Sequence, residues 1–372
     1  MSADVKTQSK PVIENQISLT GGQLNKWVPL ATLVVCICVV TALMAMLADG
    51  ETKVGRLLVA GTVLGAIVAL IVVFALSFSV EGSRRAVNRV MAYIIAGAFL
   101  LACLPLVSLL FDTIVKGVAR FDGTFFSSTM RNVVLEGGGA IHAITGTLIV
   151  TGIATLISVP IGLFTSIYLV EYGNGGWLQR GITFLVDVMT GIPSIVAGLF
   201  AYSVFTLILG PSKSGLAGAV ALCVLMIPYV VRNCEEIIRL VPDKLREASY
   251  ALGVTKWRTI VKIVLPTSIS GIVSGIIIAI ARIIGETAPL LVTMGYTDSL
   301  NFNPIPTPDR PINEMTALPV MVYNQYMQAP GRFPEPAHAR AWAGALVLVL
   351  IVMVLNLIGR WVSHKFAPKI NR

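Results

Sequence analysis

Long apolar segments alternate with short polar links along most of the chain. A helix needs about 20 apolar residues to cross the hydrocarbon core of a bilayer. On this basis we predict eight membrane spans: Val28–Leu47, Leu57–Val80, Val90–Phe111, Ala143–Val170, Gly181–Leu209, Gly215–Val231, Thr267–Val292 and Ala341–Gly359. The pattern therefore predicts an all-α fold, a polytopic transmembrane helical bundle.

The composition agrees with a membrane protein. Hydrophobic residues make up 55% of the chain and charged residues only 13%, whereas a soluble domain carries roughly 25% charged residues. Cytoplasmic links retain Lys and Arg, and the predicted links on one side hold roughly twice as many of them as those on the other. This bias predicts that both termini are cytoplasmic. It also accounts for the net charge of +9 without nucleic-acid binding.

The spans form two modules joined by a basic link at 81–89. We predict a cytoplasmic tail at 1–27 and an extra N-terminal transmembrane hairpin at 28–80. A six-span domain follows at 90–362 and contains a cytoplasmic loop at 232–266. A second cytoplasmic tail occupies 363–372. The hairpin is either a peripheral surface facing lipid or a docking site for a partner.

Residues that bind metals or perform catalysis are sparse. His142, His338 and His364 are scattered, with no Cys or carboxylate at ligand spacing, so we predict no metal site. No nucleophile and base are arranged for catalysis, so we predict no catalytic residues and no enzyme activity. The sequence has no phosphate-cradling Gly-Lys-Ser/Thr loop, so we do not expect this chain to bind ATP.

The polar segment Glu247–Pro266 lies between very apolar segments. Asp243–Leu252 has the mixed polar and apolar spacing of a helix, and Gly253 permits a left-handed turn that ends it. A second amphipathic segment begins at Lys256. These features predict a short helix on the bilayer surface with Arg246 and Glu247 exposed. From the residues alone, an interfacial helix without a partner is an alternative.

Part of this segment resembles the EAA loop of ABC-importer permeases. The matching positions are Glu247-Ala248-Ser249, Gly253 and Ile263-x-Leu265-Pro266. Ser249 is the one departure, since the family often has a second Ala there. The resemblance implies a cytoplasmic helix–turn–helix that docks into a separate ATPase subunit. The candidate coupling residues are Arg246, Glu247, Ala248, Ser249, Gly253, Ile263, Leu265 and Pro266.

Two opposite charges lie inside the predicted seventh span. Arg282 and Glu286 are four residues apart, which would place them on one helix face, with Pro289 loosening the helix beyond them. An Arg at the centre of a membrane helix costs about 2.5–3.5 kcal/mol and therefore faces a partner or a water-filled path. The two alternatives are an internal ion pair and an anion path in which the Arg fork binds oxyanion oxygens. Arg232, at the cytoplasmic end of the sixth span, is interpreted as an anchor.

Arg282–Leu291 resembles the R-x-x-G-E-T-A-P-L-L signature of phosphate permeases of the PstA type. Ile192–Leu199 and Leu318–Asn324 resemble other segments of that family. The resemblance implies a type I ABC-importer permease core of six spans, with the extra hairpin outside the family plan. It places Arg282, Glu286 and Thr287 on the substrate pathway. The gate candidates are Pro193, Ser194 and Asp187.

The resemblance also implies partners and a location. A second homologous permease subunit would complete the pore as a heterodimer, surrounded by membrane lipids. An ATPase subunit dimer would bind residues 232–266 and hold ATP and Mg, so no cofactor is expected in this chain. An extracytoplasmic phosphate-binding protein would contact the outer loops 116–142 and 295–340. The expected function is that of a multi-pass permease subunit importing inorganic phosphate across the cytoplasmic (inner) membrane of a prokaryote.

Three other functions are weighed against this one. The first is a permease of the same class for another oxyanion, such as sulfate or molybdate. Transport competition distinguishes it from a phosphate permease. A self-contained secondary transporter with Glu286 as proton relay predicts internal inverted repeats, and none is evident. An integral membrane enzyme requires a catalytic or metal constellation, which the sequence does not supply.

Overall fold

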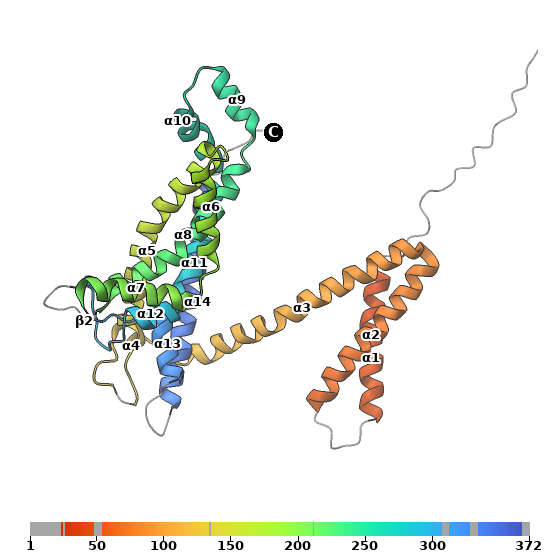
Figure 1. The fold of residues 1–372 in the computed structure, drawn as a ribbon. Helices are drawn as coiled ribbons and strands as arrows, with labels where there is room; N and C mark the ends of the chain where they lie inside the picture. The colour runs from red at the N-terminus through yellow and green to blue at the C-terminus, as the bar shows by residue number, and fades with distance from the viewer. Residues whose placement is uncertain are drawn as a thin grey trace, which may run out of the picture. The chain divides into compact units, whose positions relative to one another are not determined.

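The computed structural model describes residues 24, 27–47, 54–133, 135–210, 212–306, 312–327 and 334–366. The predicted tails at 1–27 and 363–372 lie largely outside these residues. The chain divides into two compact units, Met1–Ser108 and Leu109–Arg372 (Figure 1). The boundary between them falls inside one long helix, so each unit is described by itself. The domain boundaries expected from the sequence remain a prediction.

In the first unit, helices α1 (Trp27–Leu47) and α2 (Val54–Glu81) form a hairpin. A Cβ on Gly65 of α2 would lie only 2.6 Å from the Cα of Ile37, so the missing side chain lets the two backbones approach closely. Helix α3 (Ser83–Val118) begins directly afterwards, and Arg89 forms an ion pair with Glu81 at 2.8 Å. The outward surfaces of these helices are largely apolar and exposed, as a lipid-facing surface would be.

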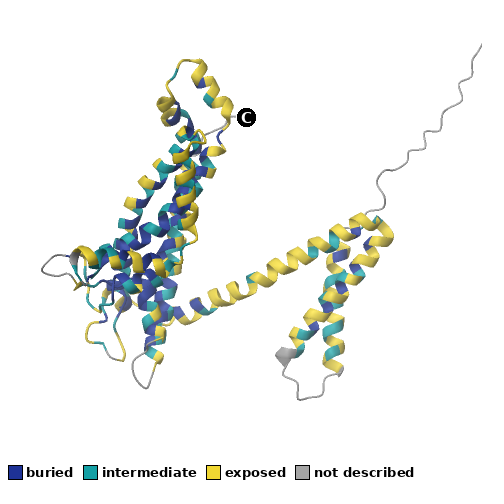
Figure 2. Cartoon of the chain, in the orientation of Figure 1, coloured by how far each residue is buried: buried dark blue, intermediate teal, exposed yellow. Residues whose placement is uncertain are grey.

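The core of the second unit is formed by α5 (Ile141–Ile167), α8 (Gly215–Arg239) and α11 (Leu265–Ile284), with α14 (Glu335–Phe366) packed on α11. Burial is concentrated where these helices meet (Figure 2). Helix α8 is the most enclosed of the candidate spans among the described residues. It therefore provides the frame against which charged side chains of neighbouring helices are positioned.

Seven helices in the described part of the chain are long and apolar enough to cross a membrane. The eight-span prediction is met when α6 (Trp177–Thr190) and α7 (Ser194–Leu209) count together as one span. These two helices are bent by 108° at the break, so the predicted span Gly181–Leu209 consists of two helices. Pro193 stands immediately before α7 with an extended backbone, and its missing N–H cannot continue the preceding helix.

The predicted seventh span is also divided. Helix α11 ends at Ile284 with Gly285 as its C-cap, and a six-residue helix, α12 (Ala288–Thr293), follows. Pro289 lies in the first turn of α12, where its missing N–H costs nothing, but it could not continue α11. The break falls within the segment that carries Arg282, Glu286 and Thr287.

The two ends of the second unit differ in character (Figure 1). One end carries α9 (Asp243–Ala251) and α10 (Lys256–Thr259), which extend beyond the core helices. The other end carries α4 (Gly123–Ser127), α13 (Leu318–Met327) and a parallel pair of two-residue strands, β1 (Lys213–Ser214) and β2 (Ile312–Asn313). The α9 end holds the EAA-like segment, and the opposite end holds both long loops.

Candidate functional site

The charged pair of the seventh span lies at the break between α11 and α12. Arg282 is in the last turn of α11, and Glu286 follows the C-cap. Their side chains meet with Nη1 and Oε1 at 3.4 Å. The pair therefore forms, but the expectation that both residues share one continuous helix face is wrong. Gly285 ends the helix between them, and the chain itself brings the carboxylate back toward the guanidinium.

The third member of this group is Tyr229 of α8, which the sequence did not single out. Nε of Arg282 lies 3.4 Å from the Tyr229 hydroxyl, and the guanidinium lies 5.7 Å from the centre of the ring. Glu286 is 15% exposed, whereas the Arg282 side chain is 58% exposed. Because the Arg282 guanidinium is contacted at one edge and its side chain is largely exposed, a ligand can reach it.

Helix α7, which begins at the gate candidate Ser194, packs against α12 beyond the same break. A Cβ on Gly198 of α7 would lie 2.6 Å from the Cα of Pro289 and 3.0 Å from its carbonyl oxygen. Thr287 stands directly before α12, and its carbonyl accepts from the N–H of Leu291 at 3.0 Å. The segment that begins with Pro193 and Ser194 therefore lies alongside the helix that follows Arg282, Glu286 and Thr287.

A second charged network lies three residues further along α8. Arg232 pairs with Asp187 of α6 and, at 2.8 Å, with Glu235. Glu235 is buried and also accepts from Arg239 at 2.5 Å. Tyr229 and Arg232 share a helix face by their spacing. The sequence interpretation of Arg232 as an anchor did not include these two carboxylate partners. The sequence signals for them were Glu235, three residues later, and Asp187 inside an apolar span.

The EAA-like segment forms the expected helix–turn–helix. Helix α9 ends at Ala251, and Gly253 adopts a positive φ of 73°. The N–H of Val254 donates to the Ser249 carbonyl at 3.2 Å, which closes the turn over the end of the helix. Between Asp243 and Thr259, four large apolar side chains are exposed: Leu245, Tyr250, Leu252 and Trp257. Such a patch marks an interaction surface.

Arg246 differs from the expectation of an exposed residue. Its side chain is only 12% exposed, and Nε and Nη2 donate to Oε1 of Glu171 at 3.0 and 2.8 Å. It also donates to the carbonyl oxygens of Val241 at 2.6 Å and Ile238 at 3.1 Å. Glu171 lies in a π-helical turn, η1 (Tyr168–Tyr172), that continues α5. Arg246 therefore ties α9 to the core, while Glu247 is exposed as expected.

Ser249, the one departure from the EAA pattern, has a hydrogen-bonding partner. Ser249 is buried, and its hydroxyl lies 2.8 Å from the hydroxyl of Thr259 in α10. The pair joins the two helices of the loop across the turn at Gly253. Beyond α10 a second π-helical turn, η2 (Ile260–Val264), leads into Leu265 and Pro266 at the start of α11. The EAA-like segment therefore connects directly to the helix that carries Arg282.

Comparison with known proteins identifies the family. Residues 158–372 match the family described as binding-protein-dependent transport system inner membrane component. The chain belongs to this family. The match contains both the EAA-like segment and the Arg282–Leu291 segment, and the extra hairpin lies outside it.

Individual relatives agree with this assignment. The chain is 45% identical over 280 residues to the phosphate transport system permease protein PstA 1 of Mycobacterium tuberculosis (strain CDC 1551 / Oshkosh), covering 74% of this chain and 88% of the relative. It is 40% identical over 286 residues to the protein PstA of Yersinia pestis, covering 76% and 92%. A chain of the crystal structure of the bacterial alginate ABC transporter with its alginate pentasaccharide-bound periplasmic protein shares the fold at a TM-score of 0.54. That match has 12% identity and covers 75% of this chain and 95% of that one.

The family assignment agrees with the features of the second unit. As a permease of this family, the chain is a multi-pass inner-membrane protein of the pore-forming type. Among the described residues, no group of three His, Cys, Asp or Glu could hold a metal ion.

Proposed function

We propose that this chain is the permease subunit of an ATP-driven importer that moves inorganic phosphate across the cytoplasmic membrane of a prokaryote. The observation that carries the proposal is Arg282, an intramembrane guanidinium that is 58% exposed at a helix break. Relatives at 45% and 40% identity are named as phosphate transport permeases. Family membership and this site support the same function.

The geometry at Arg282 suits transient oxyanion binding. A guanidinium presents paired N–H groups that match two oxygens of phosphate. Glu286 holds one edge of the group at 3.4 Å, and Tyr229 lies beside Nε. Because the ion pair with Glu286 is long, an incoming anion can take over the guanidinium without first breaking a tight contact. Glu286 then limits how firmly the anion is held, which favours passage over trapping.

The route continues along α8 toward the α9 end of the unit. Arg232 lies one helical turn beyond Tyr229 and is balanced by Asp187 and Glu235. The balanced charge makes it a weaker anion site than Arg282, as an exit position requires. The gate is the contact between α7 and α12, where Gly198 touches Pro289. Separation of these two short helices would open the space beside Thr287.

The same arrangement supports the expected partners. The ATPase subunit dimer binds residues 232–266 through the exposed apolar side chains of α9 and α10, and it holds ATP and Mg. A second homologous permease subunit covers the exposed side of Arg282. The extracytoplasmic phosphate-binding protein contacts loops 116–142 and 295–340, and both termini are cytoplasmic. Movement of α9 reaches α5 through the Arg246–Glu171 pair, and it reaches the Arg282 break through η2 and α11.

Phosphate uptake by the assembled complex in vesicles tests this function. Arg282→Lys keeps the charge but loses the planar fork, so we expect uptake to fall at least about tenfold. Glu286→Gln removes the competing carboxylate and should change the apparent KM for phosphate. Arg180→Lys, at an exposed position near the start of α6, is the matched control.

Three results would contradict the proposal. If both Arg282→Lys and Glu286→Gln take up phosphate like the unmodified complex, these residues do not line the route. If excess sulfate or molybdate abolishes phosphate uptake while being imported faster, the cargo is another oxyanion. ATP hydrolysis by the purified chain alone would contradict its assignment as a subunit without an ATPase site.

A further inference from the structure

Arg340 is a buried cation at the loop-rich end of the second unit. It lies in the second turn of α14 and is 1% exposed. Nε donates to Oε1 of Gln325 at 2.9 Å, and Nη1 donates to the carbonyl oxygens of Leu135 at 2.8 Å and Gly137 at 3.3 Å. Within the described part of the chain, Nη2 donates no hydrogen bond and no carboxylate forms an ion pair with this guanidinium. A buried charge without a counter-ion is costly.

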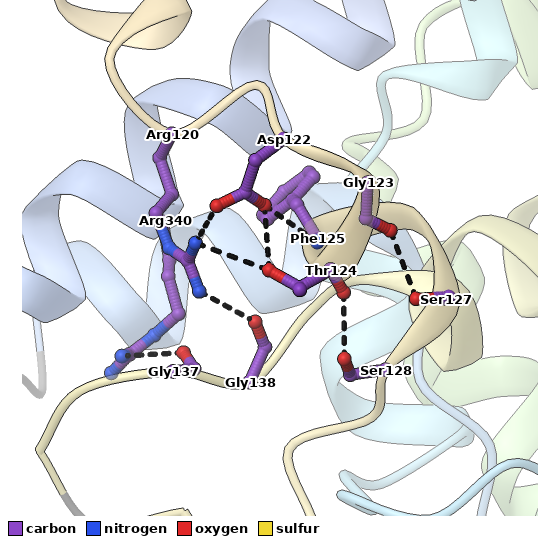
Figure 3. A network of polar contacts seen from close by, with 10 residues as sticks. All are labelled: Arg120, Asp122, Gly123, Thr124, Phe125, Ser127, Ser128, Gly137, Gly138 and Arg340. Atoms are coloured by element: carbon purple, nitrogen blue, oxygen red, sulfur yellow. Dashed lines mark hydrogen bonds and ion pairs between the residues drawn. The ribbon is translucent and has the colours of Figure 1, made fainter.

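The neighbouring arginine is satisfied differently. Figure 3 shows Arg120 beside Arg340, above the loop that carries Gly137 and Gly138. Arg120 pairs with Asp122, and it donates to the Gly138 carbonyl at 3.1 Å. Asp122 also caps α4 by accepting from the N–H of Phe125 at 2.8 Å. Arg120 thus has its own carboxylate, whereas buried Arg340 forms no ion pair with any described carboxylate.

A cavity of about 260 Å³ lies beside Arg340. It is lined by Met130, Val133, Tyr296, Asp298, Asn324, Gln325 and Arg340. Because a water molecule occupies about 30 Å³ in the liquid, the cavity has room for one tetrahedral oxyanion and several waters. Burial, with a contribution from Asp298, raises the pKa of Tyr296 to about 12, so its phenol remains a neutral hydrogen-bond donor. Asn324 adds amide donors to the same wall.

The position of this cavity relates it to the proposed route. Its lining residues come from both long loops, 116–142 and 295–340, which are the expected docking surfaces of the binding protein. Tyr296 follows the C-terminus of α12 by three residues, and Thr287 directly precedes its N-terminus. A helix of six residues rises about 9 Å. The cavity and the Arg282 break are therefore joined by one short helix.

We propose that this cavity is a receiving site for one phosphate ion at the outer end of the permease, with Arg340 as its cation. The inference rests on the proposed function and extends it, since it assigns a second binding position before Arg282. The anion binds Nη2 of Arg340, with Asn324 and Tyr296 as further donors. It offsets the charge of Arg340, since Asp298, the carboxylate that lines this cavity, forms no ion pair with that guanidinium in the described part of the chain. An ion released between the two loops is then held beside α12 until the contact between α7 and α12 opens.

Equilibrium binding of radiolabelled inorganic phosphate to the assembled complex tests this site. The complex is studied in lipid discs without nucleotide or binding protein, and every sample carries Arg282→Gln to silence the inner position. We expect the added Arg340→Gln to weaken phosphate binding by about tenfold or more and to remove one equivalent of bound phosphate. Asn324→Leu, which fills the cavity but leaves the three hydrogen bonds of Arg340 in place, should have the same effect. Arg120→Gln is the matched control and should bind phosphate like the Arg282→Gln parent.

The outcomes separate three possibilities. Unchanged phosphate binding in both the Arg340→Gln and the Asn324→Leu complexes overturns the receiving site. An equal loss of binding in the Arg120→Gln control also overturns it, because the effect would then come from collapse of the loop. Failure of the unmodified complex to take up phosphate in the presence of the binding protein overturns the proposed function instead.

Discussion

Removal of the Arg246 side chain should destabilise the junction between α9 and the membrane core. The guanidinium contacts one oxygen of Glu171 through two nitrogens, at 3.0 and 2.8 Å, and Glu171 is only 4% exposed. Arg246→Ala would leave this carboxylate buried without its cation, which typically costs about 3–5 kcal/mol. The bonds to the Ile238 and Val241 carbonyls contribute about 1 kcal/mol each. The contact with Asp243 adds at most about 1 kcal/mol, because that carboxylate is exposed.

Two measurements on the purified complex address this prediction. Thermal unfolding reports stability, and phosphate-stimulated ATP hydrolysis in the presence of the ATPase subunits reports coupling. We expect Arg246→Ala to lower the melting temperature by roughly 5–15 °C and to reduce stimulated hydrolysis. Asp243→Ala, which removes only the exposed contact, should change the melting temperature by less than about 4 °C. The double variant Glu171→Gln with Arg246→Met should recover most of the lost stability, since no unpaired charge remains.

Two outcomes would contradict this role of Arg246. If the Arg246→Ala and Asp243→Ala complexes melt at the same temperature, the buried ion pair contributes no more to stability than an exposed one. If Arg246→Ala melts normally but no longer supports ATP hydrolysis, Arg246 contacts the ATPase directly, and its burial in the free chain is not its working state.

Two further substitutions test the roles of Gly253 and Gly198. Gly253→Val should destabilise the loop by about 1–2 kcal/mol through its positive φ alone, because an added Cβ meets no atom within 4 Å. Gly253→Asn should destabilise the loop less. An equal loss of stability in both variants would contradict the explanation from backbone conformation. Gly198→Val should force α7 away from Pro289 and reduce phosphate uptake while leaving ATPase binding intact. Normal uptake by this variant would show that the contact between α7 and α12 is not the gate.

The sequence predicted the class of the protein and much of the EAA-like segment. Hydropathy depends only on residue type and on the thickness of the bilayer, so the spans could be located without any tertiary contact. The turn at Gly253 was equally accessible, because a helix of suitable spacing followed by Gly specifies its own end. The resemblance to importer permeases is confirmed by the family match and by the relatives.

The bends in the spans were less accessible to sequence reasoning. The segment 181–209 is apolar on both sides of Pro193, so hydropathy does not distinguish one straight helix from two helices bent by 108°. The angle depends on the packing of α7 against α12 at Gly198. Proline marks where a helix can break, and tertiary contacts decide whether and how it does.

Only the tertiary structure assigned partners to the charges. Arg246 lies 75 residues from Glu171 in the sequence, and Arg232 lies 45 residues from Asp187. Arg340 lies more than 200 residues from the loop whose carbonyl oxygens it binds. Local spacing could predict the Arg282–Glu286 pair, since the chain itself brings those side chains together. Whether a distant arginine meets a carboxylate, a carbonyl oxygen or a cavity depends on how the helices pack around it. Coulomb energy depends on distance and burial, and sequence position fixes neither.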